Sequence, residues 1–255
     1  MVVQMGTFKK NGVIIAILCT ALFLICAKYV GLTVEDILEL PKITKLARVP
    51  NLSTIPDLID PTIQTLAIAY VGTFFGIISS ILLGILASKN MTIHKTVYAI
   101  SRTIIMIARV IPDIVWAFLL IPAVGLGAAQ GIFAIAIHST GMIGRFFVES
   151  IEEIDPKPLE ALETCGASYT QKLMYGVLPQ IMPSFINYIL YALDHNIRVV
   201  IMLGMFGVGG LGFQFVIKFR VFKYEDVFAI LLVIFLILFG VERLSSYIRG
   251  KIIDK

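Results

Sequence analysis

Charged residues are scarce in this chain. Only 15% of its 255 residues are Asp, Glu, Lys or Arg, whereas 58% are hydrophobic, and the mean hydropathy is +0.92. Soluble domains carry about 25% charged residues. The shortage of charge therefore excludes a soluble globular domain and indicates a membrane protein. The apolar runs are continuous rather than alternating, so we expect helices, in which every backbone polar group can be paired inside a bilayer.

Cysteines are few, and the motifs of several enzyme classes are missing. The three cysteines, Cys19, Cys26 and Cys165, suggest neither a disulfide framework nor a metal-ligand cluster. There is no G-x-x-x-x-G-K-[ST] motif, and no carboxylate and histidine are arranged as in a hydrolase. No basic surface interleaved with aromatic residues points to nucleic acid. We therefore expect no catalytic residue, metal ion, cofactor or nucleic-acid partner for this chain.

Six apolar segments are long enough to cross a bilayer, which needs about 20 residues per helix. They cover residues 12–32, 62–87, 97–123, 126–148, 180–206 and 226–246. The first segment also resembles a signal peptide, but no small-residue cleavage site follows it, which favours an uncleaved helix. Six spans put both termini on one side, and the distribution of Lys and Arg favours the cytoplasmic side of a bacterial inner membrane.

The chain divides into two regions. Residues 1–61 are predicted to form an N-terminal transmembrane helix and a proline-rich linker along the outer surface, with a short interfacial helix around Val34 to Leu40. Residues 62–250 contain the other spans. Within this core, residues 150–180 form the longest polar stretch.

The polar stretch predicts two short helices joined by a hinge. Pro158 suits the first turn of a helix, and Gly166 supplies a stop. Ser168 is a typical N-cap for a second short helix, which should end where Pro179 opens the fifth span. An ordinary cytoplasmic loop with capped helices is the plainer alternative.

The spacing in this stretch resembles the coupling segment of the inner-membrane subunits of binding-protein-dependent ABC importers of type I. Their pattern is E-A-A, three residues, G, nine residues, then I-x-L-P. The candidate coupling residues are Glu160, Ala161, Gly166, Ala167, Leu178 and Pro179. Leu162 stands where a second alanine is usual, and Gly176 where isoleucine is usual.

This resemblance implies an all-α membrane protein that works with other chains. In such importers the coupling segment docks on a cytoplasmic ATPase, which binds ATP and Mg²⁺. The resemblance also implies a second copy of this chain in a homodimer, two ATPase subunits and an extracytoplasmic substrate-binding protein. This chain would then be a permease and not an enzyme.

Three other segments are similar to the phosphonate-type branch of these permeases. They are residues 108–127, with PDIVW before a GLG turn, residues 136–162, and residues 191–212 with their glycine-rich end. This similarity implies a phosphonate, phosphite or phosphate ester as the solute. A permease for methionine or another small solute is an alternative, and an ion-gradient-driven secondary transporter is an alternative of another class. The solute itself is left open, because a separate binding protein largely sets it.

Ionisable residues inside the spans are candidates for a translocation pathway, because they are costly there and face a wet cavity or another helix. Asp194 and Arg198 are four residues apart on the fifth span, in the favourable orientation for a pair. Together with Arg198, His195 and Asn196 are predicted to line a route for an anion. His138, on the fourth span, is a further candidate. The competing interpretation is that these groups only join helices.

Two more features of the spans are ambiguous. Arg109 and Asp113 repeat the four-residue spacing beside a kink expected at Pro112. The sequence GVGGLG matches a dinucleotide-binding pattern, but it lies between two spans, where no sheet is available. Its glycines, Gly207, Gly209, Gly210 and Gly212, are interpreted either as an outer gate or as a plain connection.

Overall fold

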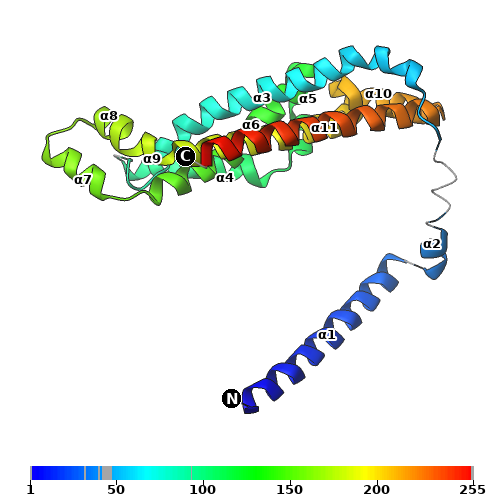
Figure 1. Cartoon of the computed structure of the whole chain (residues 1–255), viewed down its shortest axis with the longest axis horizontal. Coiled ribbons are helices and arrows are strands. Elements are labelled where there is room, and N and C mark those ends of the chain that lie inside the picture. Colours follow the sequence, from blue (N-terminus) through cyan, green and yellow to red (C-terminus); the bar gives the residue numbers. More distant parts are fainter. Residues whose placement is uncertain (1, 32, 40, 42–47, 93, 254–255) are drawn as a thin grey trace. The chain divides into compact units, whose positions relative to one another are not determined.

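The computed structural model describes residues 2–31, 33–39, 41, 48–92 and 94–253, and their regular elements are all helices (Figure 1). The chain separates into two compact units, residues 1–48 and residues 49–255. The fold is therefore all-α, as the continuous apolar runs predicted.

The first unit contains two helices. α1 covers Val2–Val30, and its apolar part runs from Ile15 to Val30 with most of its described side chains exposed. α2 covers Val34–Glu39, which confirms the short helix predicted there. The backbone N–H and the hydroxyl of Thr33 both donate to the Asp36 carboxylate, and these bonds hold the pKa of Asp36 below its usual range.

The second unit contains the remaining elements. They are η2 (Leu52–Leu58), α3 (Ile59–Leu86), α4 (Lys95–Val110), α5 (Asp113–Val124), α6 (Ala128–Glu152), α7 (Lys157–Thr164), α8 (Tyr169–Gln171), η3 (Lys172–Val177), α9 (Leu178–Leu203), η4 (Gly204–Val208), α10 (Gly210–Arg220) and α11 (Tyr224–Ile253). Figure 1 shows α7 and α8 at one end of this unit, with α10 and the first turns of α11 at the other.

α6 is the central helix of this unit, and it packs against α3, α4, α5 and α9. Small residues allow the close approach. A Cβ at Gly76 of α3 would clash with Ser139 of α6, and a Cβ at Gly141 of α6 would clash with the backbone of α4. Tight contacts through small residues are typical of helices packed in a membrane, where no hydrophobic force drives helices together.

The predicted third span, residues 97–123, is broken into two helices. α4 and α5 meet at an angle of 100°, with Ile111 and Pro112 in extended conformations between them. A residue that precedes proline is disfavoured in the helical region, which accounts for Ile111. Pro112 also lacks the N–H that would bond the Ala108 carbonyl. The indole of Trp116 donates to this carbonyl instead, at 3.3 Å.

By length and composition, four helices of the described residues are able to cross a membrane, or five if α4 and α5 count as one span. The predicted total of six spans is not confirmed. The predicted fifth span, residues 180–206, is longer than expected at its start: the helical run begins at Tyr169, passes through the π-helical segment η3 into α9, and kinks at Phe206 and Gly207. Pro179 lies in the first turn of α9, where proline is tolerated, and the π-helical segment before it continues the helical run.

The segment before α3 packs onto the later helices of the core unit. Asn51 and Thr54 donate to the same oxygen of Asp226, at 3.0 and 2.9 Å, and Lys218 lies 3.0 Å from the other. Leu58 is buried with Leu211 and Ile230. These contacts belong to the compact unit of residues 49–255, and the division of the chain after residue 61 stays a prediction.

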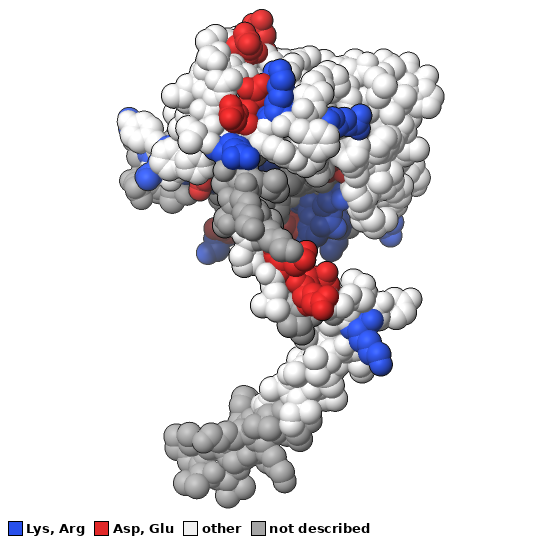
Figure 2. Space-filling view, turned by 90° about the vertical axis from the view of Figure 1, so that its right-hand side faces the viewer, with Lys and Arg blue, Asp and Glu red and all other residues white. Residues whose placement is uncertain are grey.

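Charged groups collect at the end of the core unit where α11 begins. Seen from this end in Figure 2, many Lys, Arg, Asp and Glu side chains lie on this face, while the adjoining surface on the right is mostly uncharged. The end of α10, the start of α11 and the turn between them contribute Lys218, Arg220, Lys223, Glu225 and Asp226. Such a change from charged end to apolar flank is what a membrane boundary requires.

Candidate functional site

The polar stretch forms a closed helical hairpin. α7 ends at Thr164, and Gly166, two residues later, has a φ of +75°, a value that favours glycine. The N–H of Ala167 bonds to the Leu162 carbonyl and the N–H of Gly166 to the Glu163 carbonyl, both at 2.9 Å. These two bonds form a Schellman motif, so the stop predicted at Gly166 is confirmed.

The second half of the hairpin starts at Ser168 and continues into the membrane. Ser168 and Gln171 form a capping box, which confirms the predicted N-cap. A π-helical segment, η3, then joins α8 to α9. The side chain of Gln180 accepts from the N–H of Asp155 at 3.0 Å and donates to the Gly176 carbonyl at 2.7 Å. The entry and the exit of the hairpin are therefore fixed to each other.

The two residues that depart from the family pattern, Leu162 and Gly176, lie next to each other. A Cβ at Gly176 would lie 3.1 Å from Cδ1 of Leu162 and 3.3 Å from Cδ2 of Leu159. A large residue at position 162 therefore occupies the space that a side chain at position 176 would need. A larger residue at position 162 and a smaller one at position 176 thus keep the two halves of the hairpin packed.

The hairpin presents an accessible surface. Glu160, Ala161, Gly166 and Pro179 are exposed, and Ala167 and Leu178 are half-buried. Met174 and Tyr175 are 58% and 73% exposed, a high fraction for large apolar side chains. They line an open hollow together with Thr170, Gln171, Leu178, Pro179 and Met182.

A second cluster lies where α5, α6 and α9 meet. Nδ1 of His138 is 2.6 Å from Oδ1 of Asp113, and the rings of His138 and His195 are stacked with their centroids 5.8 Å apart. Sequence reasoning had paired Asp113 with Arg109. The structure instead places Asp113 at the start of α5, beyond the bend, where its partner is His138.

The Asp194 and Arg198 pair is present on α9. Their side chains are 2.9 Å apart at the closest atoms, and a second contact of 3.2 Å makes the pair bidentate. The Arg198 side chain is 46% exposed, whereas that of Asp194 is 14% exposed. Tyr191 stacks on His195 from the preceding turn. One face of α9 thus carries an accessible cation beside the histidine cluster.

Asn196 has a different position from its neighbours. It is fully buried, and its amide donates to Thr73 of α3 and to Ser139 of α6, both at 2.7 Å. These two bonds tie three helices together. Asn196 therefore faces the interior of this chain, and no described part of its side chain reaches a surface.

The glycine-rich stretch is a capped break between α9 and α10. Gly207, Gly209 and Gly210 have φ values of +97°, +107° and +69°. The N–H of Gly210 donates to Gln64, and that of Leu211 to Thr65, at 2.9 and 3.0 Å. Gly212 packs directly against the carbonyl of Ile201. The need for glycine at these positions is explained by their role in the connection between two helices. Their role as an outer gate stays a prediction.

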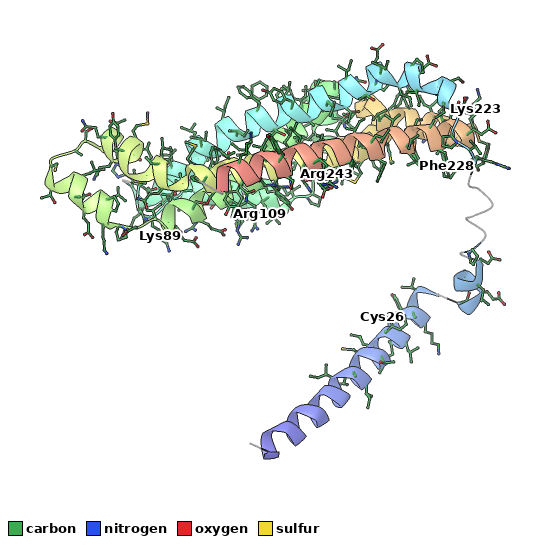
Figure 3. All side chains as sticks on the ribbon, viewed as in Figure 1. Cys26, Lys89, Arg109, Lys223, Phe228 and Arg243 are labelled. Atoms are coloured by element: carbon green, nitrogen blue, oxygen red, sulfur yellow. The ribbon has the colours of Figure 1, made fainter. Side chains whose placement is uncertain are left out.

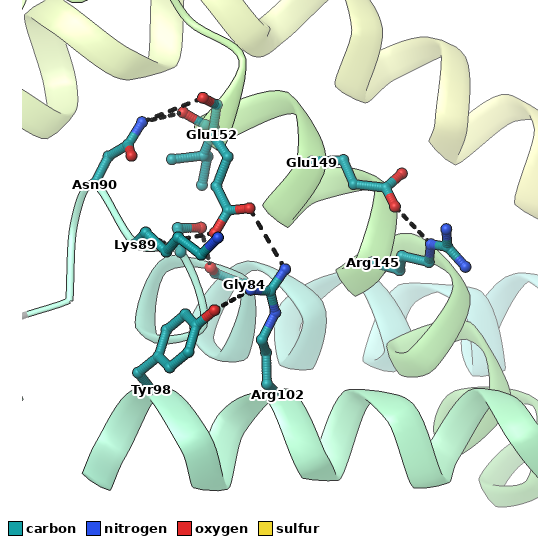
Figure 4. A network of polar contacts seen from close by, with 10 residues as sticks. Gly84, Lys89, Asn90, Tyr98, Arg102, Arg145, Glu149 and Glu152 are labelled. Atoms are coloured by element: carbon teal, nitrogen blue, oxygen red, sulfur yellow. Dashed lines mark hydrogen bonds and ion pairs between the residues drawn. The ribbon is translucent and has the colours of Figure 1, made fainter. Parts of the chain in front are cut away.

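A basic pocket lies between α4 and α6. It has a volume of about 250 Å³ and is lined by Arg102, Ile105, Met106, Arg109, Arg145, Val148 and Glu149. Arg102 pairs with Glu152 at 3.4 Å, and Arg145 pairs with Glu149 at 2.6 Å (Figure 4). Among the described residues, no carboxylate is within ion-pair distance of Arg109. Figure 3 shows Arg109 between Lys89 and Lys223 along the core unit.

The pocket and the histidine cluster share one helix, α6. Gly144 of α6 packs on Ile105, and Gly141 packs on Arg109, so α4 and α6 run antiparallel. Asp113 follows shortly after α4, at the start of α5, and lies beside His138 on the next turn of α6. Sequence reasoning missed the pocket, because its arginines come from helices whose register the sequence does not specify.

Comparison with known proteins identifies the family. The family model described as binding-protein-dependent transport system inner membrane component matches residues 80–253. The phosphite transport system permease protein PtxC of Stutzerimonas stutzeri is 35% identical over 250 residues, which cover 96% of this chain and 90% of that protein. The phosphate-import permease protein PhnE of Mycolicibacterium smegmatis is 37% identical over 205 residues, which cover 78% of this chain but only 38% of that protein.

A solved structure supports the fold. An inward-facing form of the MetNI methionine ABC transporter matches with a TM-score of 0.71 at 22% identity, covering 79% of this chain and 99% of that chain. The apolar helices and the family match together make this a multi-pass membrane protein. The chain belongs to the family of inner-membrane components of binding-protein-dependent transport systems, as the coupling-segment pattern predicted.

Proposed function

We propose that this chain is the transmembrane subunit of an ATP-driven importer and forms the pathway for a phosphorus oxyanion such as phosphite, a phosphonate or a phosphate ester. The observation that carries the proposal is the likeness to a phosphite permease along nearly the whole chain. The likeness to the methionine transporter concerns the fold alone at 22% identity, so a methionine-like solute is the second candidate.

The charges of the site suit an anion. Arg198 and the histidine cluster lie on α9 and α6, and the basic pocket adds Arg109, Arg145 and Arg102 on α4 and α6. Guanidinium groups bind oxyanions through two parallel N–H bonds, and they do so most strongly where water is scarce. Asp194, Glu149 and Glu152 each neutralise one arginine, which weakens the hold of Arg198, Arg145 and Arg102 on the solute and favours release; Arg109 keeps its full charge.

Asn196 has a supporting part in this proposal. Its two bonds to Thr73 and Ser139 hold α9 against α3 and α6. The anion route then runs over the surface that carries His195 and Arg198, while Asn196 fixes the depth and rotation of that helix face.

The proposal includes partner chains. Two copies of this permease form a homodimer, and each docks one cytoplasmic ATPase on the hairpin from Glu160 to Pro179. The ATPases bind ATP and Mg²⁺, both chain termini are cytoplasmic, and an extracytoplasmic protein delivers the solute. The exposed apolar surface around Met174 and Tyr175 supports an interface at the hairpin.

The test is transport by the reconstituted complex. Proteoliposomes with the permease, its ATPase and its binding protein should hydrolyse ATP faster with phosphite, a phosphonate or a phosphate ester than with methionine. Stimulation by methionine alone would contradict the proposed solute, and ATP-independent uptake would contradict the whole assignment.

Arg198→Gln tests the route itself. Losing one charge-assisted bond of about 1.5 kcal/mol should reduce uptake about tenfold, with complex yield and basal ATP hydrolysis unchanged. Arg243→Gln is the matched control, because this guanidinium lies over the Phe239 ring on α11, away from the cluster. If Arg198→Gln instead lowers the yield, and the double variant Asp194→Asn with Arg198→Gln restores both yield and transport, the pair only joins helices.

A further inference from the structure

The cluster of Asp113, His138 and His195 has the composition of a transition-metal site. Each residue offers one ligand atom, and the three atoms lie within 4.8 Å of one another. The residues come from three different helices, α5, α6 and α9. Two imidazoles and one carboxylate are ligands that Zn²⁺ binds well, whereas Ca²⁺ and Mg²⁺ prefer oxygen ligands alone.

The burial of the cluster favours binding. The side chains of Asp113 and His138 are only 13% and 15% exposed, so water competes weakly for their lone pairs. Nδ1 of His138 is buried and lies 2.6 Å from Oδ1 of Asp113, yet it makes no hydrogen bond of acceptable geometry in the described structure. A cation bound by both atoms would stabilise such a close pair of potential ligand atoms.

The spacing also fits. With zinc–ligand bonds of about 2.0–2.1 Å, neighbouring ligand atoms of a tetrahedral site are about 3.3 Å apart. The Asp113 and His138 atoms need to separate by roughly 0.7 Å to reach this distance. That change lies within the range of a side-chain rotation. The three ligand atoms lie within 4.8 Å of one another, so the His195 atom has at most about 1.5 Å to approach.

We propose that Asp113, His138 and His195 bind one divalent transition-metal ion, with Zn²⁺ as the best fit, and leave its fourth coordination position open. One carboxylate and two neutral imidazoles carry a single negative charge, so the occupied site has a net charge of +1. The ion joins α5, α6 and α9 at the bend after α4, and it therefore stabilises the bend. This site stands on the chain's own ligand atoms and does not depend on the solute.

The test is metal binding by the complex of permease and ATPase, treated with a chelator and then titrated with Zn²⁺ or Co²⁺. We expect one ion per permease chain by elemental analysis, and Co²⁺ absorption bands typical of four or five ligands. Asp113→Asn, His138→Gln and His195→Gln should each weaken binding more than about tenfold. His94→Gln is the matched control, since His94 is the third of the chain's three histidines and lies outside the cluster.

A further variant covers the case in which these substitutions prevent folding. His138→Cys keeps a metal ligand at the position, so it should add a thiolate-to-cobalt charge-transfer band to the Co²⁺ spectrum of the parent. The parent, with Cys19, Cys26 and Cys165, supplies the baseline. The proposal is overturned if this band is absent, if the parent complex binds less than one ion per chain, or if His94→Gln weakens binding as much as the cluster variants.

Discussion

The contact between Gly176 and Leu162 allows a quantitative test of how the hairpin is packed. A Cβ at position 176 would stand 3.1 Å from Leu162 and 3.3 Å from Leu159, which is tighter than nearly all observed contacts of this kind. Isoleucine adds further carbons beyond the Cβ. Gly176→Ile should therefore destabilise the hairpin by about 1–3 kcal/mol, the usual cost of overpacking.

Replacing Leu162 with alanine should make room for an isoleucine at position 176. Leu162→Ala alone leaves a gap, and because Leu162 is half-buried we expect a cost near the low end of the usual range, about 2 kcal/mol. In the double variant the isoleucine fills the space that Leu162 left. The double variant should then be more stable, by about 1–3 kcal/mol, than the sum of the two single destabilisations predicts, as for other residues in contact.

The assay is thermal unfolding of the detergent-solubilised complex, together with solute transported per ATP hydrolysed. Gly240→Ile is the matched control, because no atom lies within 4 Å of the position of its Cβ. A Gly176→Ile variant as stable as the parent would refute the packing argument. So would a double variant whose two effects simply add.

Two further predictions concern single residues. Gly166→Val should uncouple ATP hydrolysis from transport, because a β-branched residue at φ +75° costs about 1–2 kcal/mol and distorts the hinge; coupled transport at normal yield would contradict this. Gly125→Val, at φ +76° in another loop, is its control for strain alone. Asn196→Ala should lower the free energy of unfolding by about 1–3 kcal/mol, since it leaves the buried hydroxyls of Thr73 and Ser139 without their donor. An unchanged melting temperature would argue against this joint, and Asn90→Ala, which removes a bond to the Ile151 carbonyl, is its control.

Features that depend on near neighbours in the sequence were predictable. The stop at Gly166, the cap at Ser168 and the kink at Pro112 each follow from the conformational preferences of one or two residues. The size of the bend was not predictable, because it depends on the partners that α5 finds in α6.

Features that depend on tertiary register were missed. Asp226 is 175 residues from Asn51, and only the folded chain shows that they bond. Asp113 was paired with Arg109 from their spacing, although Pro112 separates them and the antiparallel packing of α4 and α6 supplies His138 instead. Asn196 adjoins His195 in the sequence, but a rotation of one residue on a helix turns it from the accessible face to the core.

Trp116, whose indole bonds to the carbonyl that Pro112 leaves open, is the single tryptophan of the chain. In a complex whose partner chains lack tryptophan, all indole fluorescence would therefore originate at the bend between α4 and α5. The wavelength of this emission depends on the hydrogen bond and the polarity around the ring. The protein thus contains its own optical probe, at the place where a change of angle between these two helices would first alter the surroundings of the ring.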